Sequence, residues 1–231
     1  MRVAALVLLV PSAALAGELG GTIRFEGPPH DFKAVTIAKD APVCGKQAAN
    51  DLLVVAPDGG LANVVVALKG VKAPAPPPPS KGASVDQVGC RYTPHVQAVT
   101  VGTELAVLNN DAVLHNVHGT VEAASPLTVF NVAMPFKGGR SPQVLKRPGA
   151  IKLRCDAGHT WMSAYVHVFD HPWFAVTDAR GRFTIQGVPP GKYTVELWHE
   201  PIADKQPPIV RTASVEVAEG KPATLNTAMK F

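Results

Sequence analysis

Proline and glycine are spread along this chain and separate short runs rich in valine, threonine and isoleucine. The 231 residues include 22 prolines and 20 glycines, which leave few stretches long enough for a regular helix. The runs between them, such as residues 20–25, 52–55, 63–69 and 95–101, have the length and composition of strands. Residues 121–146 are less regular. The sequence therefore predicts an all-β protein.

The N-terminal residues have the features of an export signal. The second residue is basic, residues 3–10 are continuously apolar, and residues 14–16 read A-x-A. We therefore expect residues 1–16 to be a signal peptide and the mature protein to be periplasmic or extracellular. An N-terminal core strand is the alternative, but no turn or partner follows it. No later stretch reaches the roughly 20 apolar residues that span a bilayer, so no membrane span is expected.

The charged residues argue against a nucleic-acid partner. The formal net charge is only +4, and lysine and arginine do not cluster as they do in proteins that follow phosphates. No Ser-His-Asp set or pair of catalytic carboxylates stands out in the sequence either. We therefore expect a protein without catalytic activity of its own.

One stretch concentrates side chains that bind soft metal ions. Cys155, His159 and Met162 lie within eight residues, and His115 lies forty positions before the cysteine. Two imidazoles, a thiolate and a weak thioether suit a copper site used for electron transfer. Ordinary apolar packing is the alternative role for Met162, and His118 is an alternative ligand in the upstream loop.

The three cysteines of the chain predict one disulfide. An oxidising compartment favours one bridge and leaves one thiol over. Because Cys155 lies among metal-type ligands, Cys44 and Cys90 are the expected pair. Three unpaired buried thiols are the alternative.

Two segments of the chain resemble the ligand loops of the cupredoxins. Residues 109–117, NNDAVLHNV, resemble the first loop, and the strand that runs into Cys155 resembles the second. The resemblance covers about residues 85–170 and implies a Greek-key β-sandwich with one copper ion at one end. It also implies that Asn116 joins the two loops by a hydrogen bond. The implied ligands are His115, Cys155, His159 and an axial Met162.

The spacing of the second loop departs from the best-known members of that family. It reads C-x3-H-x2-M, whereas plastocyanin has C-x2-H-x4-M and amicyanin has C-x2-H-x2-M. Whether the site is of the blue type, and whether Met162 binds the metal, therefore stay open. The binuclear loop of cytochrome oxidase subunit II shares the spacing but needs a second cysteine where Ile151 stands, so a mononuclear site is expected.

The cupredoxin resemblance also implies a docking face. An apolar rim formed by Leu114, Trp161 and Met134 would surround the exposed edge of His159 and meet the redox partner. A cytochrome or another electron carrier is the expected partner, since redox encounters need only a small patch.

Residues 174–198 resemble the carboxypeptidase regulatory-like family, a transthyretin-type β-sandwich, through two hairpins with glycine turns. The two strands that open that family's pattern stand here before the cupredoxin-like segment, which predicts an insertion into a split sandwich. The alternative is three consecutive segments, with residues 17–70 forming an edge of the cupredoxin-like unit. Such sandwiches often bind carbohydrate or dock proteins, which makes a glycan a second candidate partner.

A run of prolines separates the two predicted units. Residues 73–79 read APAPPPP, a polyproline-type spacer that cannot join a sheet. The expected segments are a signal peptide (1–16), the first strands of the split sandwich (17–72), a linker (73–84), the cupredoxin-like domain (85–170) and the rest of the sandwich (171–231).

The predicted function is that of an exported one-electron carrier with a single copper ion. A non-catalytic binding module, or a protein that stores or delivers copper, is the alternative.

Overall fold

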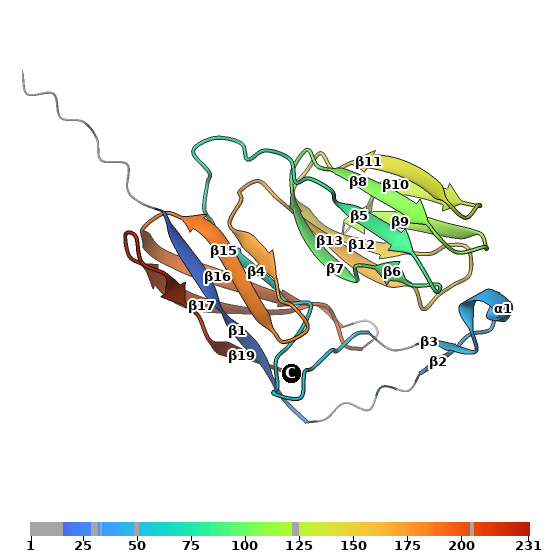
Figure 1. The fold of residues 1–231 in the computed structure, drawn as a ribbon, viewed down its shortest axis with the longest axis horizontal. Helices are drawn as coiled ribbons and strands as arrows, with labels where there is room; N and C mark the ends of the chain where they lie inside the picture. The colour runs from blue at the N-terminus through green and yellow to red at the C-terminus, as the bar shows by residue number, and fades with distance from the viewer. Residues whose placement is uncertain (1–15, 29–31, 33, 49–50, 122–124, 204–205) are drawn as a thin grey trace, which may run out of the picture.

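The computed structural model describes residues 16–28, 32, 34–48, 51–121, 125–203 and 206–231. Two β-sandwiches lie side by side in it (Figure 1). Most of the expected signal peptide, residues 1–15, falls outside the described residues. Within the described ranges, no helix is long and apolar enough to cross a bilayer. The all-β prediction is confirmed.

The central sandwich consists of a five-stranded and a four-stranded sheet. The first contains, in spatial order, β10 (Leu127–Met134), β9 (His115–Val121), β12 (Gly149–Arg154), β13 (Ser163–Phe169) and β7 (Val96–Thr100). The second contains β11 (Gly139–Val144), β8 (Glu104–Asn109), β5 (Ser84–Gln87) and β6 (Tyr92–Thr93). Leu105 and Val107 of β8 alternate inward and share a core with Val117 and Leu153 of the facing sheet.

The flanking sandwich is assembled from both ends of the chain. One sheet contains β15 (Arg182–Val188), β1 (Gly17–Glu26), β18 (Ala223–Thr224) and β19 (Thr227–Lys230). The other contains β14 (Phe174–Val176), β4 (Val65–Leu68), β16 (Gly191–His199) and β17 (Ile209–Val217). Strand β1 pairs with β15, and β4 pairs with β14 and β16, so strands from before and after the central sandwich share each sheet.

A small hairpin from the N-terminal part of the chain packs against the central sandwich. It runs from β2 (Val35–Thr36) through α1 (Ala41–Cys44) to β3 (Gln47–Ala48). Ile37 and Cys44 are buried in the core of the central sandwich. Figure 1 shows this hairpin beside the central sandwich, away from the strands of the flanking one. We call residues 35–48 the cap hairpin; they belong to the segment expected to build the flanking sandwich.

The two sandwiches meet through a third, smaller cluster. Val65 and Trp198 of the flanking sandwich pack there against Val96 and Tyr165 of the central one. The proline spacer also contacts the central sandwich near its end. The Thr100 hydroxyl of β7 donates a hydrogen bond to the carbonyl of Pro78 over 2.8 Å.

Two differences between the expected and the observed strands concern residues 52–55 and 121–146. Residues 52–55 form only an isolated bridge, between Val55 and Leu61, and not a strand. The region expected to be irregular contains β10 and β11. Strand β11 contains Pro142, which an edge strand tolerates because one side of it makes no ladder bonds.

Candidate metal centre

The predicted ligands meet where two neighbouring strands begin and end. Strands β9 and β12 are antiparallel, with Arg154 opposite His118, so the end of β12 lies beside the start of β9. His115 is the first residue of β9, and Cys155 follows the last residue of β12. His159 lies on the loop from β12 to β13.

The side chain of Asn109 stabilises the loop before His115 through hydrogen bonds. This buried residue ends β8, and its side-chain oxygen accepts the backbone N–H of Asp111 over 2.9 Å. Its amide nitrogen donates to the carbonyls of Val113, over 3.1 Å, and Met134, over 2.8 Å. The side chain therefore replaces the backbone partners that the loop lacks.

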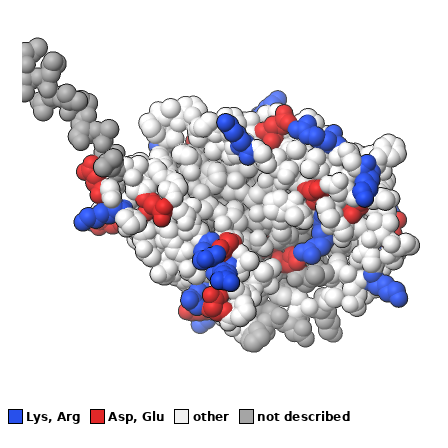
Figure 2. Space-filling view, in the orientation of Figure 1, with Lys and Arg blue, Asp and Glu red and all other residues white. Residues whose placement is uncertain are grey.

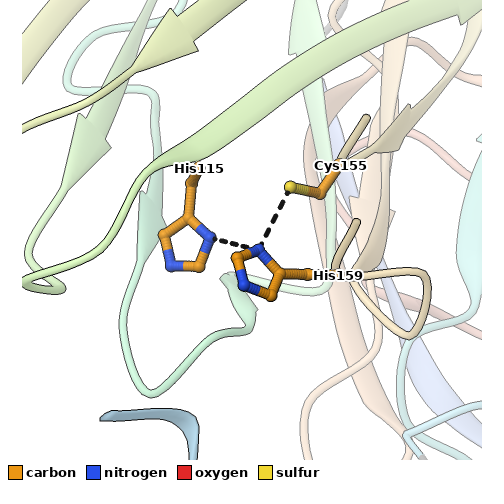
Figure 3. Close-up of side chains that lie close together, drawn as sticks. All are labelled: His115, Cys155 and His159. Atoms are coloured by element: carbon orange, nitrogen blue, oxygen red, sulfur yellow. Dashed lines mark hydrogen bonds between the residues drawn. The ribbon is translucent and has the colours of Figure 1, made fainter. Parts of the chain in front are cut away.

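The two imidazoles and the thiol converge on one point (Figure 3). The Nδ1 atoms of His115 and His159 are 3.0 Å apart, and the Cys155 Sγ lies 3.6 Å from the second of them. The three donor atoms lie within 4.8 Å of one another, and all three residues are buried. A single metal ion between them could bind all three.

Two carboxylates set the orientation of the imidazoles. Asp111 Oδ2 lies 2.9 Å from His115 Nε2, and Asp40 Oδ2 lies 2.9 Å from His159 Nε2. An ionised carboxylate only accepts hydrogen bonds, so each Nε2 carries the hydrogen. In neutral rings both Nδ1 lone pairs then face each other, an arrangement that a bound cation stabilises. Burial lowers the pKa of His115, against the hydrogen bond to Asp111, which favours the neutral ring that binds metal.

Asp111 also anchors the loop of the disulfide. Its carboxylate accepts the backbone N–H groups of Gly89, over 2.8 Å, and Cys90, over 2.7 Å, in addition to His115. Neither Asp111 nor Asp40 was predicted as a site residue. A carboxylate four residues before His115 was a weak signal for Asp111, whereas the sequence around Asp40 contains none.

Asn116 lies between the two ligand loops. Its Oδ1 accepts the backbone N–H of Asp156, next to the ligand cysteine, over 3.2 Å. Its Nδ2 donates to Asn131 Oδ1 over 2.6 Å, and its carbonyl accepts the hydroxyl of Tyr92. The side chain thus joins the start of β9 to the loop that follows β12.

Met162 lies one turn beyond His159. It is buried in the same core cluster as Cys155, and its backbone N–H donates to the His159 carbonyl over 3.0 Å. Its role as a ligand stays a prediction.

The predicted docking rim needs correction. Leu114 is exposed, but Met134 is only 3% exposed because it packs in the core of the central sandwich, so it was wrongly placed on the rim. Trp161 is half-buried: its ring meets that of His159 edge-on at 5.2 Å, and its N–H donates to the Cys90 carbonyl over 3.0 Å. Phe136, which was not predicted, is 76% exposed.

The expected exposed edge of His159 is not found. The residue is 0% exposed, because Asp40 of the cap hairpin lies against its Nε2. The interpretation was wrong because the cap hairpin comes from a part of the sequence that was assigned to the other sandwich.

The predicted disulfide between Cys44 and Cys90 is present, at a sequence separation of 46. Cys155 is left as the free thiol. Cys90 also lies within 4.8 Å of Asp111 and His115, but as a half-cystine it offers no thiolate to a metal ion.

Other histidines have partners of their own. His118, the alternative ligand, contacts Asp156 through Nδ1 over 2.7 Å and Thr128 through Nε2 over 2.9 Å. His95 pairs with the buried Glu200. His199 is buried and contacts the carbonyl of Glu200.

Comparisons with known proteins match parts of the chain. The family model that matches is "Polysaccharide lyase family 4, domain II", over residues 171–225. The carboxypeptidase regulatory-like resemblance over the same region stays a prediction. No curated protein matches.

Solved cupredoxin structures align with part of the chain. A purple cupredoxin from Nitrosopumilus maritimus is 24% identical and covers 38% of this chain and 99% of its own, with a TM-score of 0.33. A reduced amicyanin variant is 20% identical and covers 45% of this chain and 98% of its own, at a TM-score of 0.33. A copper-containing nitrite reductase from Thermus scotoductus SA-01 is 21% identical, covers 44% of this chain and 28% of its own, and has a TM-score of 0.32.

Proposed function

We propose that this protein binds one copper ion through His115 Nδ1, Cys155 Sγ and His159 Nδ1 and carries single electrons. The observation that supports it most is the convergence of two lone pairs and a thiol, with the Nδ1 atoms 3.0 Å apart and each Nε2 held by a carboxylate. The donor set, two histidines and one cysteine with a nearby methionine, is that of copper sites used for electron transfer. Bound copper would supply the one-electron chemistry.

The protein's own residues would hold the ligands still. His115 and Cys155 lie at the ends of paired strands, and Asn116 joins the two loops. A site that moves little when the charge of the metal changes favours fast electron exchange. We therefore propose a carrier rather than an enzyme, and Met162 would be a further, weak ligand.

The proposed partner is a redox protein that docks on exposed apolar side chains near the first ligand loop. Leu114, next to His115, and Phe136 are both exposed. On the face drawn in Figure 2, the charged side chains of the described residues are interspersed, positive beside negative. A small apolar patch suits a weak and transient encounter.

Export to the periplasm or the cell exterior is part of the proposal. The A-x-A motif before residue 17 supports it, and so does the disulfide, because such bridges persist mainly in oxidising compartments.

Copper storage is a second candidate, favoured by the burial of both imidazoles. Glycan binding by the flanking sandwich is a further candidate, which rests on the match of residues 171–225 to a domain of polysaccharide lyases.

Titration and voltammetry test the main proposal. We expect the purified protein to take up one Cu(II) per chain and to show a reversible one-electron wave. His115→Ala and His159→Ala should each weaken binding strongly. A protein that binds copper without a reversible wave would support storage, and more than one tightly bound ion would contradict a mononuclear carrier.

A further inference from the structure

Asp40 uses its side chain in an unusual way for its position. It precedes α1, where an aspartate commonly accepts N–H groups of the first turn, yet it makes no side-chain capping bond. Its carbonyl instead accepts the N–H groups of Val43, over 2.9 Å, and Cys44, over 2.8 Å. The carboxylate is thereby left to reach His159, 119 positions later in the sequence.

Lys39, the residue before Asp40, contacts the loop that contains His159. Lys39 donates from Nζ to the carbonyl of Ala157. Its side chain also crosses Gly158, where an added Cβ would lie 3.2 Å from Lys39 Cδ. Two consecutive residues of the cap hairpin therefore contact three consecutive residues of the loop that presents His159.

The disulfide joins the last residue of α1 to the residues that support the second imidazole. Cys44 of α1 is bonded to Cys90, whose backbone N–H donates to Asp111 over 2.7 Å. Asp111 in turn holds His115. The cap hairpin is therefore linked to both histidines, directly through Asp40 and indirectly through the disulfide.

We propose that Asp40 is a positioning residue of the copper centre and that the cap hairpin closes the centre over His159. This inference rests on the proposed function. Asp40 fixes the ring with Nδ1 toward the thiol, and its negative charge favours Cu(II) over Cu(I) through the imidazole. The closure also means that electrons do not leave through a bare edge of His159, since that residue is 0% exposed.

Two substitutions of Asp40 separate the effect of its contact with His159 from the effect of its negative charge. Asp40→Ala removes both, whereas Asp40→Asn keeps a side-chain oxygen and removes only the charge. Glu104→Gln is the matched control, because it removes an equal charge from an exposed pair with Arg140, at the other end of β8 from Asn109.

The copper-loaded protein gives the first readout. We expect Cu(II) affinity to fall by about 10- to 100-fold in Asp40→Ala, with a smaller loss in Asp40→Asn. The reduction potential should rise in both variants and stay unchanged in Glu104→Gln. A potential that is equal in all four proteins would overturn the positioning role.

The metal-free protein gives the second readout and keeps this inference separate from the proposed function. Nitrogen-15 NMR should show His159 with its hydrogen on Nε2 in the native chain and a mixed tautomer in Asp40→Ala. Cys155 should react faster with iodoacetamide in Asp40→Ala than in the native chain or Glu104→Gln. Unchanged tautomer and alkylation rate would refute the closure even if copper binds, whereas both changes in a chain without copper affinity would refute only the proposed function.

Discussion

Asp111 shows how one buried side chain supports both the fold and the centre. It accepts three hydrogen bonds, from the His115 ring and from the backbone of Gly89 and Cys90. Each buried N–H left without a partner costs about 1–3 kcal/mol, and loss of a carboxylate behind a ligand histidine typically weakens metal binding about 10- to 100-fold.

Asp111→Ala should therefore lower the free energy of unfolding of the metal-free protein by about 2–4 kcal/mol. Urea denaturation followed by tryptophan fluorescence measures it. Glu104→Gln, an exposed charge change, should stay within about 0.5 kcal/mol of the native chain. A loss no larger than that of the control would show that the three bonds contribute little.

The proposed ligands, including Met162 as a candidate, could be predicted from the sequence because their types are informative at short range. Cys155, His159 and Met162 lie within one loop, and soft donors rarely occur together by chance. Asp40 could not be predicted, because carboxylates are common and its partner is 119 positions away. Asp111 was closer to the proposed ligands, but a carboxylate in the loop just after a strand has many ordinary roles.

At the scale of elements, the cap hairpin joins parts of the chain that the sequence keeps apart. Short β-branched and apolar runs bounded by glycine and proline turns predicted β1, β4 and the strands after residue 174. The cap hairpin has strands of only two residues, too short for any period to be recognised. Its attachment depends on Cys44, Ile37 and Asp40, whose partners are set by the tertiary fold.

Removal of the disulfide tests that attachment. The bridge joins two positions at a sequence separation of 46. In the Cys44→Ala/Cys90→Ala variant we expect unfolding free energy to fall by about 2–5 kcal/mol. The cap hairpin should also open, so that Cys155, then the only thiol, is alkylated faster under native conditions. An alkylation rate equal to that of the native chain, in a variant that remains folded, would show that the hairpin stays in place without the bridge.

At the scale of the whole molecule, the two sandwiches meet at a buried histidine. His167 lies on β13 of the central sandwich, and its ring meets that of Trp198 of the flanking one edge-on at 4.2 Å. Its Nε2 has no hydrogen-bond partner among the described residues. Burial lowers the pKa of His167 from 6.5 to about 4, so the buried ring resists protonation.

This contact should make the metal-free protein sensitive to acid. Well above pH 6.5 the His167 ring is neutral in both the folded and the unfolded protein. Between pH 6.5 and about 4 the ring takes up a proton in the unfolded chain but stays neutral in the folded one. Stability should fall through that window by up to about 1.4 kcal/mol per pH unit. His167→Gln should remove this part of the dependence. Urea unfolding at about pH 7.5 and about pH 5 measures it, and equal losses in both proteins would contradict the assignment.

The two-sandwich plan was the part of the architecture most accessible from the sequence, since the motifs behind its two family resemblances are local features. The covering of His159 could not be predicted from the sequence, because it depends on where the N-terminal segment packs.

The central claim, a copper ion bound by a cysteine thiolate and two histidines, has a direct test in the visible absorption and EPR spectra of the protein with one equivalent of Cu(II). We expect an intense thiolate-to-copper band in the native protein and none in Cys155→Ser. A folded native protein that shows no such band would contradict the claim.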